Sequence, residues 1–139
     1  MSHIPRPSLS GIHHVAIIAT DIERSKSFFA DILGFSVRRE NYRDNSQSWK
    51  IDLLAPCGVE IELFSFPNPP ARPSYPEAAG LRHLALRVDS VADWVRYLKA
   101  QDIACEGTRT DPYTGAFFTF FADPDGLPIE LYQTVDATA

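Results

Sequence analysis

The sequence predicts an α+β protein built from two tandem βαβββ modules. A repeat leads to this prediction: residues 11–17 return as residues 80–86 at an offset of 69, and residues 61–64 return as residues 129–132 at an offset of 68. The second observation is a stretch at residues 67–76 with five prolines, a density that neither a helix nor a central strand tolerates. Each module therefore opens and closes with related strands, and a linker separates the two.

The first module is expected at residues 11–66. Its aliphatic segment at 14–19 favours a strand. Thr20, with Glu23 three residues later, forms a capping box for a helix that ends at Gly34. Three further strands complete the module, at about 35–42, 48–54 and 59–66.

The second module, at residues 80–133, repeats this order after a linker at 67–79. A strand at 81–88 leads to a helix capped by Asp89 or Ser90. Further strands are expected at about 103–109, 116–122 and 128–133. Together the two modules form one domain over residues 9–135.

Composition limits the possible partners. The chain has 139 residues, 45% of them hydrophobic, and a net charge of −5 without any run of Lys and Arg, which argues against nucleic-acid binding. No apolar run approaches the roughly 20 residues of a membrane span. Cys57 and Cys105 lie too far apart for a zinc knuckle or a thioredoxin motif. We therefore expect a cytoplasmic protein with a small-molecule substrate and no membrane partner.

Two histidines in strands occupy equivalent positions in the repeat. His14 aligns with His83, whereas the neighbouring His13 aligns with Arg82. Because side chains alternate along a strand, His14 and His13 point to opposite faces. The repeat thus selects His14 and His83 as a functional pair.

Two glutamates also occupy equivalent positions, each between an isoleucine and a leucine in an apolar strand. An ionised carboxylate in such surroundings needs a cation. Two imidazoles and two carboxylates suit nickel, zinc, cobalt, iron(II) or manganese, and they leave coordination positions open for a substrate. The predicted ligands of a catalytic metal are His14, Glu62, His83 and Glu130.

At these residues the chain resembles the vicinal-oxygen-chelate superfamily, and within it the short glyoxalase I-like proteins of the glyoxalase–bleomycin resistance–dioxygenase family. The resemblance also rests on two motifs, Asp21-x-x-Arg24-Ser25-x-x-Phe28-Phe29-x-x-Ile32-Leu33-Gly34-Phe35 and Asp123-Pro124-Asp125-Gly126-x-x-Ile129-Glu130. It implies curved mixed sheets around a metal cavity and a homodimer. The cavity lies either within one chain or across the subunit interface.

The resemblance further implies a metal-dependent lyase or isomerase that resembles lactoylglutathione lyase. Such an enzyme acts in methylglyoxal detoxification, converting the hemithioacetal of an α-ketoaldehyde and a thiol such as glutathione to an S-acyl thiol. It would use one divalent metal ion per site, Ni²⁺ or Zn²⁺ first, with Mn²⁺, Co²⁺ and Fe²⁺ as alternatives. Glu130, or Glu62 as its symmetric counterpart, would be the catalytic residue that moves the proton.

One departure from the family pattern keeps other functions open. Ile18 and Phe66 stand where glutathione-using members commonly carry arginine and asparagine. The alternatives are an epimerase or other enzyme of this superfamily with a different vicinal-oxygen substrate, and a metal-bound binding or resistance protein without turnover. Expected substrate contacts are Arg24, Phe66, Arg109 and Tyr113.

Overall fold

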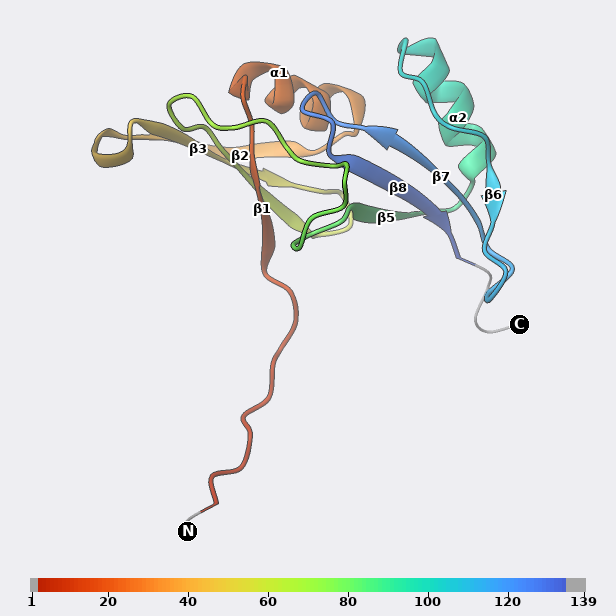
Figure 1. Ribbon diagram of the computed structural model, residues 1–139, viewed down its shortest axis with the longest axis horizontal. Helices are drawn as coiled ribbons and strands as arrows, with labels where there is room; N and C mark the ends of the chain where they lie inside the picture. Colours follow the sequence, from red (N-terminus) through yellow and green to blue (C-terminus); the bar gives the residue numbers. More distant parts are fainter. Residues whose placement is uncertain (1–2, 135–139) are drawn as a thin grey trace.

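The computed structural model describes residues 3–134 and contains two four-stranded sheets with few helices. Figure 1 shows the sheets side by side, with helices on one side of them. This arrangement confirms the α+β fold predicted from the repeat. Val135, the last residue of the expected domain, lies outside the described residues.

Strands make up most of the regular structure. The first sheet comprises β1 (His14–Ile18), β2 (Ser36–Arg43), β3 (Ser48–Leu54) and β4 (Glu60–Phe64). The second sheet comprises β5 (Leu84–Val88), β6 (Arg109–Thr110), β7 (Phe117–Ala122) and β8 (Pro128–Gln133). The helical segments are α1 (Ile22–Ser27), the π-helix η1 (Phe28–Ile32) that continues it, the 3₁₀ turn η2 (Asp44–Ser46) and α2 (Val91–Ala100).

The two sheets share one topology. Their strand orders are β1-β4-β3-β2 and β5-β8-β7-β6. The first strand of each module runs parallel to the last, and the other pairs are antiparallel. The parallel pair places the histidine-bearing end of each module beside its glutamate-bearing strand.

The core lies between the sheets and the helices. On β4 and β8, Leu63 and Leu131 are buried, and on η1 Phe29 is fully buried. The rings of Phe28 and Phe121 lie 6.0 Å apart, so the two modules contribute to one hydrophobic cluster. Because alternate side chains of a strand face opposite ways, the polar side chains of these strands collect on the other face.

The N-cap of the first helix differs from the prediction. Asp21, not Thr20, caps α1, and its carboxylate accepts a hydrogen bond from Arg24 N at 3.2 Å. Thr20 instead donates through its backbone N and its hydroxyl to Asp125 in the turn before β8. Thr20 thus joins the two modules. In the second module Ser90 is the cap, one of the two residues expected.

The strand expected at 103–109 is also shorter than predicted, since only β6 forms there. Arg109 pairs with Phe118, but Glu106 N donates to Phe120 O at 3.0 Å, one residue out of that register. Gly107 lies within the slip. An irregularity of this kind at a sheet edge ends the ladder.

Two segments belong to neither a helix nor a strand: the linker and the stretch before β1. No helix or strand lies between Phe64 and Leu84, and Arg72 Nη2 fastens the end of this linker by donating to the carbonyls of Leu81 and Arg82, at 2.9 Å each. Residues 3–13 run away from the body (Figure 1). No helix among residues 3–134 is long and apolar enough to cross a membrane.

Candidate metal centre

The first module brings His14 and Glu62 together on the face opposite the core. Ala16 pairs with Glu62 in the β1–β4 register, and His14 lies two residues before Ala16 on the same face. Nδ1 of His14 lies 3.4 Å from Oε2 of Glu62. The Glu62 side chain is only 14% exposed, so its carboxylate lies in a partly desolvated site.

The second module repeats this arrangement. Ala85 pairs with Glu130 in the β5–β8 register, and His83 lies two residues before Ala85. Nε2 of His83 lies 3.4 Å from Oε1 of Glu130, whose side chain is again 14% exposed. The ring of Phe120 contacts the His83 ring edge-on, with centroids 5.0 Å apart. Each module therefore presents one histidine and one carboxylate 3.4 Å apart, through Nδ1 of His14 in the first module and Nε2 of His83 in the second.

Within one chain the two pairs remain separate. Among residues 3–134, no group of three or more His, Cys, Asp and Glu side chains lies close enough together to hold a metal ion. Within residues 3–134, each His–Glu pair therefore stands by itself.

A network of cations and carboxylates surrounds the first pair. Lys50 Nζ lies 2.8 Å from Oδ1 of Asp52 and 3.6 Å from Oε1 of Glu62, and Arg39 Nε donates to Asp52 at 3.0 Å. Burial alone would raise the pKa of Asp52, but the hydrogen bonds from Lys50 and Arg39 outweigh it and lower that pKa. Asp52 is therefore ionised and holds Lys50 beside Glu62.

His13 extends the first pair outward. Its Nδ1 lies 2.8 Å from Nδ1 of His14, and also 3.6 Å from Oε2 of Glu60. One of the two imidazoles must carry the shared proton. His13 was expected to point away from His14; the structure places the rings in edge-to-face contact, with centroids 5.1 Å apart, because His13 precedes β1 and escapes its alternation.

Two of the four expected substrate contacts lie beside the pairs. Phe66 stacks on Phe64, with ring centroids 6.2 Å apart. Arg109 lies over Phe118 and Phe120, and together with His83 it lines a cavity of about 380 Å³ that the linker closes on one side.

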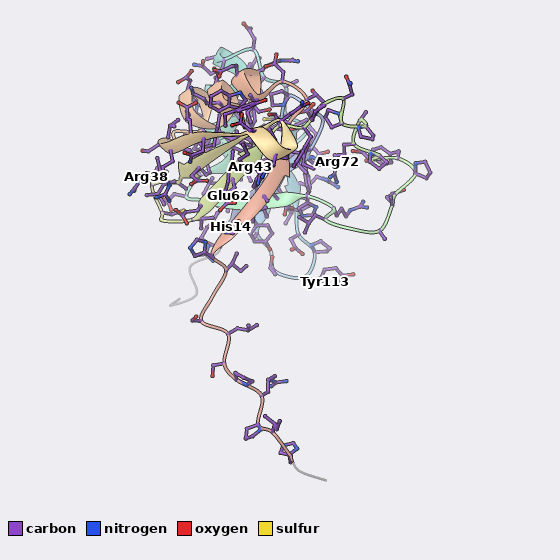
Figure 2. All side chains as sticks on the ribbon, turned by 90° about the vertical axis from the view of Figure 1, so that its left-hand side faces the viewer. His14, Arg38, Arg43, Glu62, Arg72 and Tyr113 are labelled. Atoms are coloured by element: carbon purple, nitrogen blue, oxygen red, sulfur yellow. The ribbon has the colours of Figure 1, made fainter. Side chains whose placement is uncertain are left out.

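The other two expected contacts lie elsewhere. Arg24 lies on α1 and lines a groove with Asp31 and Pro124, on the helix side of the sheets. Tyr113 is 94% exposed in the turn before β7. Figure 2 shows Tyr113 at the lower end of the body.

One residue near the first pair was missed from the sequence. Arg43, at the end of β2, lies over the ring of Phe64 on the same face as Glu62. No motif marks Arg43, since its position depends on a β-bulge between Val37 and Arg39 that sets which residues of β2 reach this face. Figure 2 shows Arg43, Glu62 and His14 close together on the near side of the molecule.

The fold and the paired histidines and glutamates match a known family. Residues 11–131 match the family model of the Glyoxalase/Bleomycin resistance protein/Dioxygenase superfamily, and the chain belongs to this family. It is 56% identical over 125 residues to the uncharacterized protein YaeR of Escherichia coli, covering 90% of this chain and 97% of that protein. The structure is similar to that of a glyoxalase family protein from Enterococcus faecalis, with a TM-score of 0.83, 47% identity, and coverage of 88% and 97% of the two chains.

Two less similar proteins have names that state what they do. A 2-epi-5-epi-valiolone epimerase from Actinomyces is 29% identical over 146 residues, covering 90% of this chain and 80% of that protein. The fold also resembles that of the fosfomycin resistance protein FosX of Listeria monocytogenes, solved in complex with Mn(II), with a TM-score of 0.69, 19% identity, and coverage of 93% and 94%. Members of the family thus act on small molecules, and a divalent metal is bound in one structural neighbour.

Proposed function

We propose that this protein is a metal-dependent enzyme whose site forms between two chains. His14 and Glu62 of one chain would bind the metal together with His83 and Glu130 of its partner. The observation that carries this proposal is the presence of two matched His–Glu pairs, one per module, that are not brought together within residues 3–134 of one chain. A two-fold homodimer would join each pair with its complement and form two equivalent sites.

The donor set fits a divalent first-row metal. Neutral imidazole nitrogens and partly desolvated carboxylates form a borderline nitrogen–oxygen set that nickel, zinc, manganese, cobalt and iron(II) accept. A cation would also offset the cost of keeping the two carboxylates ionised at 14% exposure. When bound, such an ion polarises two adjacent oxygens of a substrate and makes the neighbouring C–H bond more acidic.

Exposed apolar side chains support a homodimer. Leu9 and Ile12, in the segment before β1, are 97% and 85% exposed. Ile18 on β1 and Leu81 just before β5 are 55% and 71% exposed. Burying such side chains against a second copy would remove apolar area from water near both His–Glu pairs.

Glu130 is the better candidate for moving the proton. Oε1 of Glu62 already faces Lys50 Nζ, a cation that competes for the carboxylate oxygens. Glu130 forms an ion pair only with His83 among the described residues, so it is freer to accept a proton from carbon and return it to an adjacent position. Phe120 beside His83 limits the access of water to this half of the site.

The reaction we favour is of the glyoxalase I type, in which a glutamate moves a proton between adjacent carbons of a hemithioacetal of methylglyoxal and glutathione. A second candidate is epimerisation next to a carbonyl. It is supported by the similarity to an epimerase and by the apolar Ile18 and Phe66 at positions where glutathione users carry polar residues. Both reactions require the same metal and the same glutamate.

Complementation between chains tests the site. One variant, His14→Ala/Glu62→Gln, loses the first pair, and the other, His83→Ala/Glu130→Gln, loses the second. Each alone should bind no metal. Refolding the two together in equal amounts should restore about one quarter of the wild-type metal capacity, because half of the dimers are mixed and each mixed dimer has one intact site of two. The test measures the metal content of the mixed protein, prepared without a histidine tag.

A site within one chain predicts no recovery on mixing, which would contradict the shared arrangement. The reaction is tested separately with methylglyoxal and glutathione across Ni²⁺, Zn²⁺, Mn²⁺ and Fe²⁺. Formation of the S-lactoyl thiol supports the glyoxalase I type. Deuterium exchange next to the carbonyl of an acyl thioester, without that product, supports an epimerase. The absence of both reactions in metal-loaded protein would contradict the proposed activity.

A further inference from the structure

Arg43 is held rigidly on the face that carries Glu62. Its Nε and Nη2 atoms donate to Oγ of Ser48 at 3.1 and 2.8 Å, and Ser48 is fully buried. The guanidinium carbon lies 4.8 Å from the ring centroid of Phe64 and 5.9 Å from that of Phe66. Two hydrogen bonds and two ring contacts thus fix the plane of the guanidinium.

In the part of the chain that the structure describes, the charge of Arg43 has no carboxylate partner. Among residues 3–134 it forms no ion pair, and Nη1 donates no hydrogen bond to any described residue. Two other arginines on these faces differ in this respect. Arg39 is paired with Asp52, and Arg109, which lies 4.8 Å over Phe118 in the second module, is paired with Glu106. Arg43 is therefore a fixed cation with a free donor edge.

The free edge of Arg43 lies beside the proposed metal site. Phe64 follows Glu62 by two residues on β4, so the two side chains share a face about 7 Å apart along the strand. The stacked guanidinium then lies on the order of 10 Å from the Glu62 carboxylate. Figure 2 shows Arg43, Glu62 and His14 in one region, with Arg38 of the same strand projecting away.

A cation fixed by neutral partners is suited to an anion from outside the chain. Guanidinium groups bind carboxylates and phosphates through two parallel hydrogen bonds, and a guanidinium that is already oriented loses little freedom on binding. An arginine that only keeps the surface hydrated has no need of a buried serine and two aromatic rings to orient it. The surroundings of Arg43 therefore favour a binding role.

We propose that Arg43 binds an anionic group of the substrate, so that the substrate class is a vicinal-oxygen compound that also carries a carboxylate or a phosphate. The anionic group would lie on the order of 10 Å from the oxygens that meet the metal. This inference rests on the proposed metal site, since it assigns the other end of the same substrate. Arg43 is the specificity-determining residue of the first module.

Hydroxamates provide the probes, because they chelate metals through two adjacent oxygens. Acetohydroxamate lacks a second anionic group; matched hydroxamates with a terminal carboxylate or a terminal phosphonate carry one. Affinities for the Mn²⁺-loaded protein are measured by calorimetry. The wild type should bind one of the anionic probes about tenfold or more tightly than acetohydroxamate. The better of the two identifies the anion.

Arg43→Gln should lose about tenfold in affinity for that probe and keep its affinity for acetohydroxamate. Arg43→Lys keeps the positive charge but lacks the paired donors of the guanidinium. Its affinity for that probe should lie between those of the wild type and Arg43→Gln. Arg38→Gln is the matched control, with the same change of charge on the same strand, and it should behave as the wild type. Equal affinities of the wild type for all three probes, or an unchanged preference in Arg43→Gln, would overturn the assignment.

A metal-free arm separates this inference from the proposed function. Inorganic phosphate is titrated into the metal-free protein and followed by ³¹P NMR. Weaker binding in Arg43→Gln and not in Arg38→Gln supports the anion site even if Mn²⁺ fails to bind, in which case only the metal site is wrong. Phosphate binding that is equal in the wild type and Arg43→Gln counts against Arg43 whatever the metal does.

Discussion

His14 and Glu62 face each other across the parallel strands β1 and β4, with Nδ1 and Oε2 3.4 Å apart. The second module reproduces this distance between His83 and Glu130. In both modules the glutamate pairs in register with an alanine two residues beyond the histidine. Side chains two residues apart on a strand share a face. Backbone hydrogen bonds between parallel neighbouring strands then fix the distance from the histidine's strand to the glutamate's strand. The β1–β4 sheet register thus accounts for the first pair, whereas His83 lies one residue before β5 and approaches Glu130 from the end of that strand.

Removal of the metal should lower the thermal stability of the protein. A ligand that binds only the folded state stabilises it by about 2.7 kcal/mol at a hundredfold excess over its dissociation constant. For a domain of this size that corresponds to a change in Tm of roughly 5–10 °C. Calorimetric melting of protein loaded with Zn²⁺ or Ni²⁺, before and after dialysis against EDTA, measures the difference.

Glu62→Gln is the test variant for this stabilisation, because it removes one ligand charge with little change in shape. It should abolish most of the shift in Tm. Glu60→Gln makes the same substitution two residues earlier on the same face and should leave the shift intact. A shift that is unchanged in Glu62→Gln would mean that the metal binds elsewhere.

Asp52→Asn should destabilise the protein at neutral pH. Asp52 is 5% exposed and accepts hydrogen bonds from both Lys50 and Arg39. Asparagine keeps one acceptor but removes the carboxylate charge that Lys50 and Arg39 share, at a cost of about 1–3 kcal/mol. Urea unfolding at pH 7 measures the loss in free energy of unfolding. Asp44→Asn, on the exposed η2 turn, should unfold like the wild type, and an equal effect of both substitutions would show that the network around Asp52 contributes nothing.

The repeat made the fold and the two His–Glu contacts predictable, because equivalent positions of the two modules carry the same residue types. His14 and His83 align, and so do Glu62 and Glu130, so the sequence identifies the partners before any contact is known. The ends of β3 and β8 also match the predicted ranges 48–54 and 128–133; turn residues follow β3 at 56–58 and precede β8 at 123–126.

Features that depend on register or on contacts between modules were not predictable. Thr20 has the sequence context of an N-cap, yet it bonds to Asp125, which lies 105 residues later in the chain. The slip at Gly107 shortens β6 to two residues, although the preceding segment alternates like a strand. Arg43 reaches the Glu62 face only because a bulge shifts the register of β2. Local sequence patterns carry no information about contacts between modules or about shifts of strand register.

The two cysteines should differ in their rates of alkylation. Cys57 is exposed in the turn before β4, whereas Cys105 packs against the core. Burial raises the pKa of the Cys105 thiol, which lowers its thiolate fraction near neutral pH. Iodoacetamide at pH 7.5, followed by peptide mass spectrometry, should label Cys57 on the order of tenfold faster or more. In urea the two rates should become equal, and equal rates in the folded protein would contradict the burial of Cys105.

Asp123→Asn should stabilise the protein at neutral pH. Oδ1 of Asp123 accepts hydrogen bonds from the backbone N of Asp125 and of Leu127, at 2.9 and 2.8 Å, and thereby shapes the turn before β8. Oδ2 is buried without a partner among the described residues. Asparagine can keep the Oδ1 acceptor while it removes the buried charge, so the turn should survive and the desolvation cost should fall.

The pH dependence of this effect has a definite sign. Burial raises the pKa of Asp123 above its ordinary value of 3.8, so the folded protein binds the proton more tightly than the unfolded chain. Stability therefore falls as the pH rises from the ordinary value through the raised one, and the full cost is present at pH 7. Asp123→Asn lacks this titration. The free energy of unfolding of Asp123→Asn should exceed that of the wild type by about 1 kcal/mol at pH 7, and this difference should shrink toward pH 4.

Asp123→Ala is the control for the turn. It removes the Oδ1 acceptor together with the charge, leaves the backbone N of Leu127 unpaired, and should destabilise the protein at every pH by about 1–3 kcal/mol. Urea unfolding at pH 4 and pH 7 compares both variants with the wild type. If Asp123→Asn were as destabilising as Asp123→Ala at pH 7, the ionised carboxylate would stabilise the folded state. The pKa of Asp123 would then be lowered by folding, not raised.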